Sequence, residues 1–218
     1  MHTTTAQISL SARDLLRVGP VLPVIVIHDA GLAVDLAAAL VAGGIRALEV
    51  TLRTPAALQA IRQIRDHVPD ALVGAGTVLS PADWQRAQEA GALFGISPGL
   101  TAALLQAAQH SPLPFVPGVA TASEAMTALD AGFTALKLFP AEAVGGRSLL
   151  KSLHGPLPQL LFCPTGGINL GNAANYLALP NVACVGGSWL VPEAALAARD
   201  WGAITALARE AAALRSGA

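Results

Sequence analysis

Short apolar runs recur along the chain every ~20 to 25 residues, and this spacing constrains the fold more than any other feature. The spacing matches a βα unit, and repeated βα units place their strands parallel in one sheet. Eight such steps predict an α/β fold, a (β/α)₈ TIM barrel. The eight runs expected to form strands are 21–27, 47–52, 72–77, 93–97, 114–119, 135–140, 160–165 and 182–187.

The segments between the runs carry helix signals. Ser80 before Pro81 is typical of an N-cap followed by proline in the first turn, and Thr121 with Glu124 forms a capping box. The segment 5–19 has no strand before it, and we expect an extra N-terminal helix that closes the barrel floor. The other helices are expected at 29–44, 54–67, 80–91 and 121–132.

The chain shows no linker or low-complexity tract, so its 218 residues predict one domain, 1–218. The alternative architecture is a doubly wound open sheet. Such a sheet commonly binds dinucleotides through a glycine-rich turn after its first strand, and this sequence has no such turn. The barrel is therefore the favoured interpretation.

Composition excludes several classes of partner. Charged residues make up 12% of the chain and the net charge is −1, so we expect no nucleic-acid partner. The segment between Glu89 and Glu124 carries no formal charge, but prolines and polar residues interrupt it, and we expect no membrane span. Cys163 and Cys184 lie in apolar runs typical of reduced, buried thiols, which favours a soluble protein of the cytoplasm.

A lysine interrupts the apolar run "FTALKLFPA" (133–141). Side chains alternate between the two faces of a strand, so Leu136 and Leu138 suit the helix layer while Lys137 points into the barrel. Barrel enzymes place their sites at the C-terminal mouth, and a buried amine that loses its charge is a nucleophile. Alternatively, only the lysine stem is buried and its ammonium reaches solvent at the rim.

The second strand supports a chemical role for this lysine. The same alternation turns Glu49, Thr51 and Arg53 inward, and buried charges without partners are costly. An amine that condenses with a ketone, a carboxylate that moves protons and a guanidinium that holds an anion together suit carbonyl chemistry through an imine. Thr77 adds a hydroxyl at the same mouth. A structural ion-pair network remains the alternative.

Two glycine pairs follow the last two strands, where barrels often bind phosphate through backbone N–H groups. They are Gly166-Gly167 and Gly186-Gly187, the second followed by Ser188. Each pair alone is weak evidence, but their presence in both loops predicts a phosphate site. Thr165, just before the first pair, is placed to touch a substrate hydroxyl.

We expect no metal and no cofactor, because the five histidines have no ligand spacing. His28 alone lies at a strand end near the expected mouth.

Six motifs, in order, resemble the 2-keto-3-deoxy-6-phosphogluconate (KDPG) and 4-hydroxy-2-oxoglutarate (KHG) aldolase family, and the resemblance covers nearly the whole chain. They are "LEVTLRT" (48–54), "GAGTVL" (74–79), "SPG" (97–99), "KLFPAE" (137–142), "PTGGI" (164–168) and "VGGSWL" (185–190). Two departures are a variable tail over residues 1–7 and Leu138, where an aromatic residue is also common.

The resemblance implies a metal-independent class I aldolase in which Lys137 forms the Schiff base and Glu49 is the general acid/base. It implies that Arg53 and Thr77 hold the substrate carboxylate, and that Pro98 and Phe139 shape the pocket wall. Thr165 is assigned to the pocket from its position alone. The phosphate of the 2-keto acid substrate would bind to Gly166, Gly167, Gly186, Gly187 and Ser188. The family is typically homotrimeric.

The implied reaction is the cleavage of KDPG to pyruvate and glyceraldehyde 3-phosphate in the Entner–Doudoroff pathway. Alternatives are a preference for KHG or for the galactonate epimer of the phosphorylated substrate. Further alternatives are a phosphate-binding barrel isomerase and a noncatalytic barrel that serves as a binding module.

Overall fold

The computed structural model describes residues 10–214, so the predicted variable tail at 1–7 lies outside the described residues. Every predicted strand position contains a strand, and each strand lies within its predicted run. The strands are β1 (Val21–Ile25), β2 (Ala47–Thr51), β3 (Leu72–Gly76), β4 (Gly95–Ile96), β5 (Phe115–Val116), β6 (Gly118–Val119), β7 (Ala135–Leu138), β8 (Leu161–Pro164) and β9 (Val185–Gly187).

The fifth predicted strand is divided in two at Pro117. Its first part, β5, pairs with β4, and its second part, β6, pairs with β7. The run 115–119 therefore connects a six-stranded sheet, ordered β5-β4-β3-β2-β1-β9, to a three-stranded sheet, ordered β6-β7-β8.

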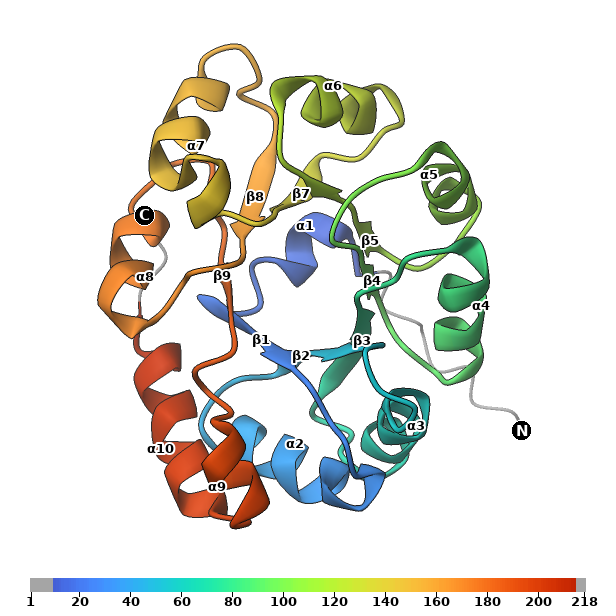
Figure 1. The fold of residues 1–218 in the computed structure, drawn as a ribbon, viewed down its shortest axis with the longest axis vertical. Helices are drawn as coiled ribbons and strands as arrows, with labels where there is room; N and C mark the ends of the chain where they lie inside the picture. The colour runs from blue at the N-terminus through green and yellow to red at the C-terminus, as the bar shows by residue number, and fades with distance from the viewer. Residues whose placement is uncertain (1–9, 215–218) are drawn as a thin grey trace, which may run out of the picture.

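The sheet is parallel and curled. The first strand pairs with the last, with Val21 opposite Val185 and Leu22 opposite Gly186. Single bridges join β8 to the chain around β9, one of them between Thr165 and Gly186. Figure 1 shows the strands gathered around a central axis, with α1 inside the ring in this view and the other helices outside it. Pairing between the first and last strands is typical of a curled sheet and excludes the alternative of an open doubly wound sheet.

The predicted helices and their caps are present. The Ser80 hydroxyl accepts a hydrogen bond from the Asp83 N–H, and Thr121 with Glu124 forms the predicted capping box. The helices are α1 (Ala12–Leu15), η1 (Ala30–Leu32), α2 (Ala33–Ala42), α3 (Ala57–His67), α4 (Pro81–Glu89), α5 (Ala102–Gln109), α6 (Ala122–Asp130), η2 (Glu142–Val144), α7 (Gly146–His154), α8 (Leu170–Leu177), α9 (Glu193–Ala197) and α10 (Trp201–Ala212).

The core has two parts. Alternate strand residues such as Leu48, Val50 and Leu136 pack against the helices, while residues on the other strand face pack inside the sheet with Leu15 and Leu16 at the end of α1. Of the predicted N-terminal helix, the described residues contain only the four of α1.

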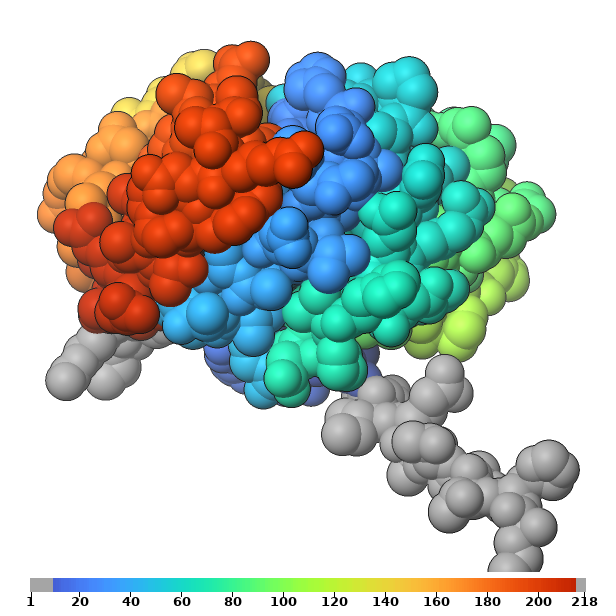
Figure 2. Space-filling model, turned by 90° about the horizontal axis from the view of Figure 1, so that it is seen from below, coloured from blue at the N-terminus to red at the C-terminus, as the bar shows by residue number. Residues whose placement is uncertain are grey.

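Helix α10, near the C-terminal end of the described chain, packs against α2 in its N-terminal part. Figure 2 shows the C-terminal segment, in red, beside N-terminal segments in blue, and the Thr205 hydroxyl of α10 donates to the Ala39 carbonyl of α2 at 2.9 Å. No helix within residues 10–214 is long and apolar enough to cross a membrane.

Candidate active site

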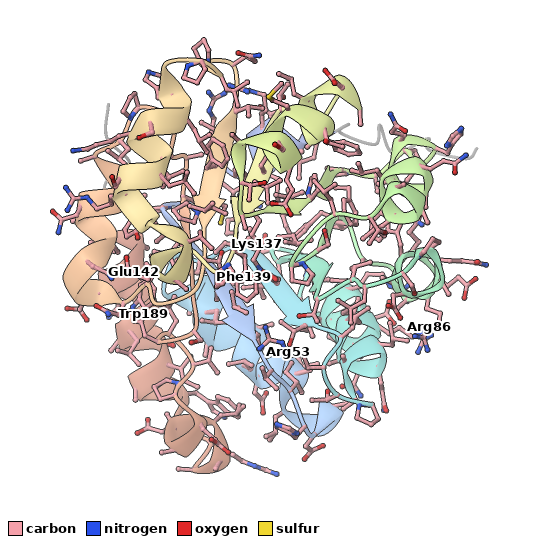
Figure 3. All side chains as sticks on the ribbon, turned by 45° about the horizontal axis from the view of Figure 1, so that its top comes forward. Arg53, Arg86, Lys137, Phe139, Glu142 and Trp189 are labelled. Atoms are coloured by element: carbon pink, nitrogen blue, oxygen red, sulfur yellow. The ribbon has the colours of Figure 1, made fainter. Side chains whose placement is uncertain are left out.

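A buried ion pair lies inside the curled sheet. The Lys137 Nζ on β7 donates to the Glu49 Oε1 on β2 at 3.0 Å, although 88 residues separate the two positions. Lys137 is 5% exposed and Glu49 is 1% exposed. The strand alternation predicted this inward placement, and Figure 3 shows Lys137 near the centre of the molecule beside Phe139. The Lys137 ammonium lies 5.6 Å from the centre of the Phe139 ring.

The position of Glu49 depends on a glycine in the neighbouring strand. A Cβ atom on Gly76 would lie 2.2 Å from the Glu49 Oε1 and 2.7 Å from its Cδ, which is closer than atoms approach. Only a residue without a side chain leaves this space for the carboxylate. The second oxygen, Glu49 Oε2, is buried and has no hydrogen-bond partner within the described residues. Since a buried oxygen without a partner is costly, this atom is suited to receive a hydrogen bond or a proton from a ligand.

Arg53 and Thr77 are in contact at the C-terminal ends of the two neighbouring strands β2 and β3. The Arg53 Nε donates to the Thr77 Oγ1 at 3.2 Å. Thr77 has φ +54°, a left-handed conformation that is unusual for a β-branched residue and is found most often at functional sites. Arg53 lies just beyond the end of β2 and is an exposed residue. Figure 3 shows it below Lys137 and Phe139 in the view. Its remaining N–H groups suit a bidentate contact with a carboxylate.

A cavity of about 350 Å³ opens beside these residues. It brings together most of the predicted binding residues, which lie at or just beyond the C-terminal ends of β2, β7, β8 and β9. Lys137, Glu49 and Thr77 are not part of its lining. Its lining consists of Val24, Val26, Arg53, Phe139, Thr165, Gly166, Gly167, Ile168, Gly186, Gly187 and Ser188. Val24, Val26 and Ile168 are the lining residues that sequence reasoning missed. The strand alternation that identified Glu49 would have turned Val24 and Val26 inward as well.

Pro98 does not line this cavity, but it lies close to the lysine strand. A Cβ atom on Gly118 would lie 2.3 Å from the Pro98 carbonyl carbon, and Gly118 is directly opposite Lys137 in the sheet. Thr51, also predicted to face inward, is buried and donates its hydroxyl to the Ile25 carbonyl at 2.9 Å, which is a structural contact. His28 is exposed and is absent from the cavity lining.

Thr165 is held close to the second glycine pair. A Cβ atom on Gly186 would lie 2.1 Å from the Thr165 Oγ1.

Both cysteines, Cys163 and Cys184, are buried free thiols, as the sequence predicted. The Cys163 side chain, through a hydrogen bond, and burial both raise the pKa of the Cys184 thiol.

Within the described part of the chain, histidine, cysteine, aspartate and glutamate residues form no group of three or more that could hold a metal ion. The site instead offers a buried amine, a carboxylate with a free oxygen, an exposed guanidinium and a glycine-lined cavity. These groups suit the condensation of the amine with a ketone that also carries anionic groups.

Residues 12–207 match the family described as KDPG and KHG aldolase. The chain belongs to this aldolase family. The KHG/KDPG aldolase of Escherichia coli (strain K12) is 55% identical over 201 residues, which cover 92% of this chain and 94% of the relative.

Two solved structures of family members resemble the chain closely. KDPG aldolase from Legionella pneumophila, with pyruvate captured as a covalent carbinolamine intermediate, has a TM-score of 0.92 and 50% identity, and the match covers 93% of this chain and 98% of the other. The Zymomonas mobilis enzyme with 3-phosphoglycerate has a TM-score of 0.89 and 50% identity, over 94% and 96% of the two chains. The predicted family resemblance is therefore confirmed.

Proposed function

We propose that this chain is a class I aldolase that cleaves KDPG to pyruvate and glyceraldehyde 3-phosphate. The observation that carries the proposal is the buried contact between Lys137 and Glu49 next to a cavity lined by both glycine pairs. The covalent pyruvate intermediate of the Legionella relative supports the imine chemistry. The reaction is a carbon–carbon lyase reaction and belongs to the Entner–Doudoroff pathway.

The first step forms the imine. The Lys137 Nζ, in its neutral form, attacks the C2 ketone to give a carbinolamine, and loss of water leaves a protonated imine that accepts electrons. Glu49, in contact with the same nitrogen at 3.0 Å, is placed to move the protons of the carbinolamine.

The second step breaks the carbon–carbon bond. Glu49, acting through a water, takes the proton of the C4 hydroxyl, the C3–C4 bond breaks, and the electron pair moves into the imine to give an enamine. Glyceraldehyde 3-phosphate leaves. Protonation of the enamine at C3 and hydrolysis of the imine then release pyruvate and regenerate the amine. The buried oxygen without a partner, Glu49 Oε2, is the atom best suited to this proton transfer.

The anionic ends of the substrate bind on either side of the lysine. Arg53, oriented by Thr77, holds the carboxylate, and Phe139 and Thr165 shape the wall of the pocket. Pro98, which packs against Gly118 opposite Lys137, lies behind this wall. The phosphate binds in the part of the cavity formed by the two glycine loops, Gly166-Gly167 and Gly186-Gly187, with Ser188. The Zymomonas relative with 3-phosphoglycerate supports a phosphorylated ligand.

The larger architecture is also part of the proposal. The pairing of β1 with β9 and the bridges between β8 and β9 support a closed (β/α)₈ barrel in which α1 covers the floor of a single domain. The family resemblance supports a homotrimer, and the two free thiols support a reducing cytoplasm. Size-exclusion chromatography with light scattering tests the trimer.

A second candidate function is the cleavage of KHG, because the Escherichia coli relative carries both substrates in its name. Comparison of kcat/KM for KDPG, its galactonate epimer and KHG tests the proposal. We expect the highest value for KDPG, because its phosphate can use the glycine loops. A higher value for KHG or for the epimer would contradict the proposed substrate while retaining the imine mechanism.

A further inference from the structure

The Gly166-Gly167 loop is fixed from outside the cavity. The Gly166 carbonyl accepts the Glu142 N–H at 3.1 Å, and the Gly167 carbonyl accepts the Asn172 side-chain amide at 3.0 Å. Within residues 10–214, the N–H groups of both glycines have no protein acceptor. The carbonyl groups of Gly166 and Gly167 are therefore held by hydrogen bonds, while their N–H groups remain available to an anion.

Glu142 makes the closest contact with this loop. A Cβ atom on Gly167, which has φ +78°, would lie 2.6 Å from the Glu142 Cγ, so the carboxylate stem packs directly against the glycine. The preceding residue, Ala141, donates its N–H to the Thr165 carbonyl at 2.8 Å. Residues 141–142 thus continue from the lysine strand β7 and support the loop along its length.

Tyr176 fixes the Glu142 side chain. Its buried phenol on α8 donates a hydrogen bond to the Glu142 Oε1. Burial and the Glu142 carboxylate raise the pKa of Tyr176, so the phenol remains a neutral donor at physiological pH. Figure 3 shows Glu142 away from Lys137 and Arg53, on the α7 side of the site. Glu142 and Tyr176 are both absent from the cavity lining, and they contact the loop on the side of η2 and α8.

We propose that Tyr176 and Glu142 are positioning residues that hold the Gly166-Gly167 loop in the shape that binds the substrate phosphate. The inference rests on the proposed function and deepens it, because it assigns the phosphate affinity partly to a phenol–carboxylate contact behind the loop. The unphosphorylated part of the substrate does not use this contact. The Tyr176–Glu142 hydrogen bond therefore contributes to the selection of phosphorylated over unphosphorylated 2-keto acids.

The test compares Tyr176→Phe with the wild type on KDPG and on KHG. We expect KM for KDPG to rise about three- to tenfold, since part of one charge-assisted hydrogen bond is lost, while KM for KHG and borohydride trapping of pyruvate stay unchanged. Glu142→Ala should behave similarly, whereas Glu142→Gln should restore most of the affinity because its amide oxygen and stem remain.

A matched control is Thr205→Val, which removes a partly buried hydrogen bond between α10 and α2, away from the cavity. It should change neither KM. Titration of each protein with inorganic phosphate gives a second readout that does not require turnover: weaker binding by Tyr176→Phe supports the inference even if the wild type fails to cleave KDPG. An unchanged phosphate affinity, or an equal loss on KDPG and KHG, would overturn it.

Discussion

Gly76→Ala is the substitution that best tests whether the exact place of the Glu49 carboxylate limits the reaction. Gly76 lies in β3 and does not have a left-handed backbone, so the backbone itself accepts alanine. The new Cβ would lie 2.2 Å from the Glu49 Oε1, whereas ordinary contacts begin at 3.4 Å. The carboxylate must therefore move by about 1.2 Å, the difference between these two distances.

The expected effect on turnover follows from that displacement. A shift of about 1 Å in a catalytic group costs roughly 10²-fold in rate, so kcat for KDPG cleavage should fall by about that factor. Overpacking of a buried site also costs about 1–3 kcal/mol of unfolding free energy. The protein should still fold and still form an imine with pyruvate, because Lys137 itself is unchanged.

The assay measures pyruvate release from KDPG, with thermal unfolding measured in parallel. Gly99→Ala is the matched control, since it is the same chemical change near the mouth and a Cβ atom there would have no neighbour within 4 Å. We expect near wild-type turnover for this control. If Gly76→Ala were as active as the control, the reasoning about the position of Glu49 would be refuted.

Three further predictions follow from the site. Glu49→Gln should slow turnover by about 10²- to 10⁴-fold while imine trapping survives, and full activity would remove Glu49 from its role. Ser188→Ala should raise KM for phosphorylated substrate with little effect on pyruvate proton exchange, whereas an equal loss in both assays would place Ser188 at the reacting carbon. The raised pKa of Cys184 and its burial predict that alkylation at pH 8.5 labels neither cysteine of the native protein and both after denaturation. Labelling of the native protein would show that the interior opens.

Sequence periodicity predicted the strands and the inward direction of Lys137 and Glu49, because alternation is a local property of extended chain. The division of the fifth strand at Pro117 was not predicted, since it depends on which neighbour each half pairs with. The predicted alternation also included Arg53, although β2 ends two residues earlier.

Contacts between distant residues could not be predicted. Position 76 requires a glycine only because the Glu49 side chain of the neighbouring strand occupies the space of a Cβ atom there. Likewise, nothing local in the sequence relates Glu142 to Tyr176, 34 residues later, although both support a loop that the sequence identified. The motif "KLFPAE" contains Glu142, but the motif alone does not say which loop that residue contacts.

The central claim, that Lys137 is the nucleophile, is tested most directly by incubating the protein with pyruvate and sodium borohydride and locating the adduct by peptide mass spectrometry. We predict one reduced pyruvyl adduct, on Lys137, and none in Lys137→Ala. An adduct on another residue, or no adduct on the folded wild-type protein, would contradict the imine mechanism proposed for this site.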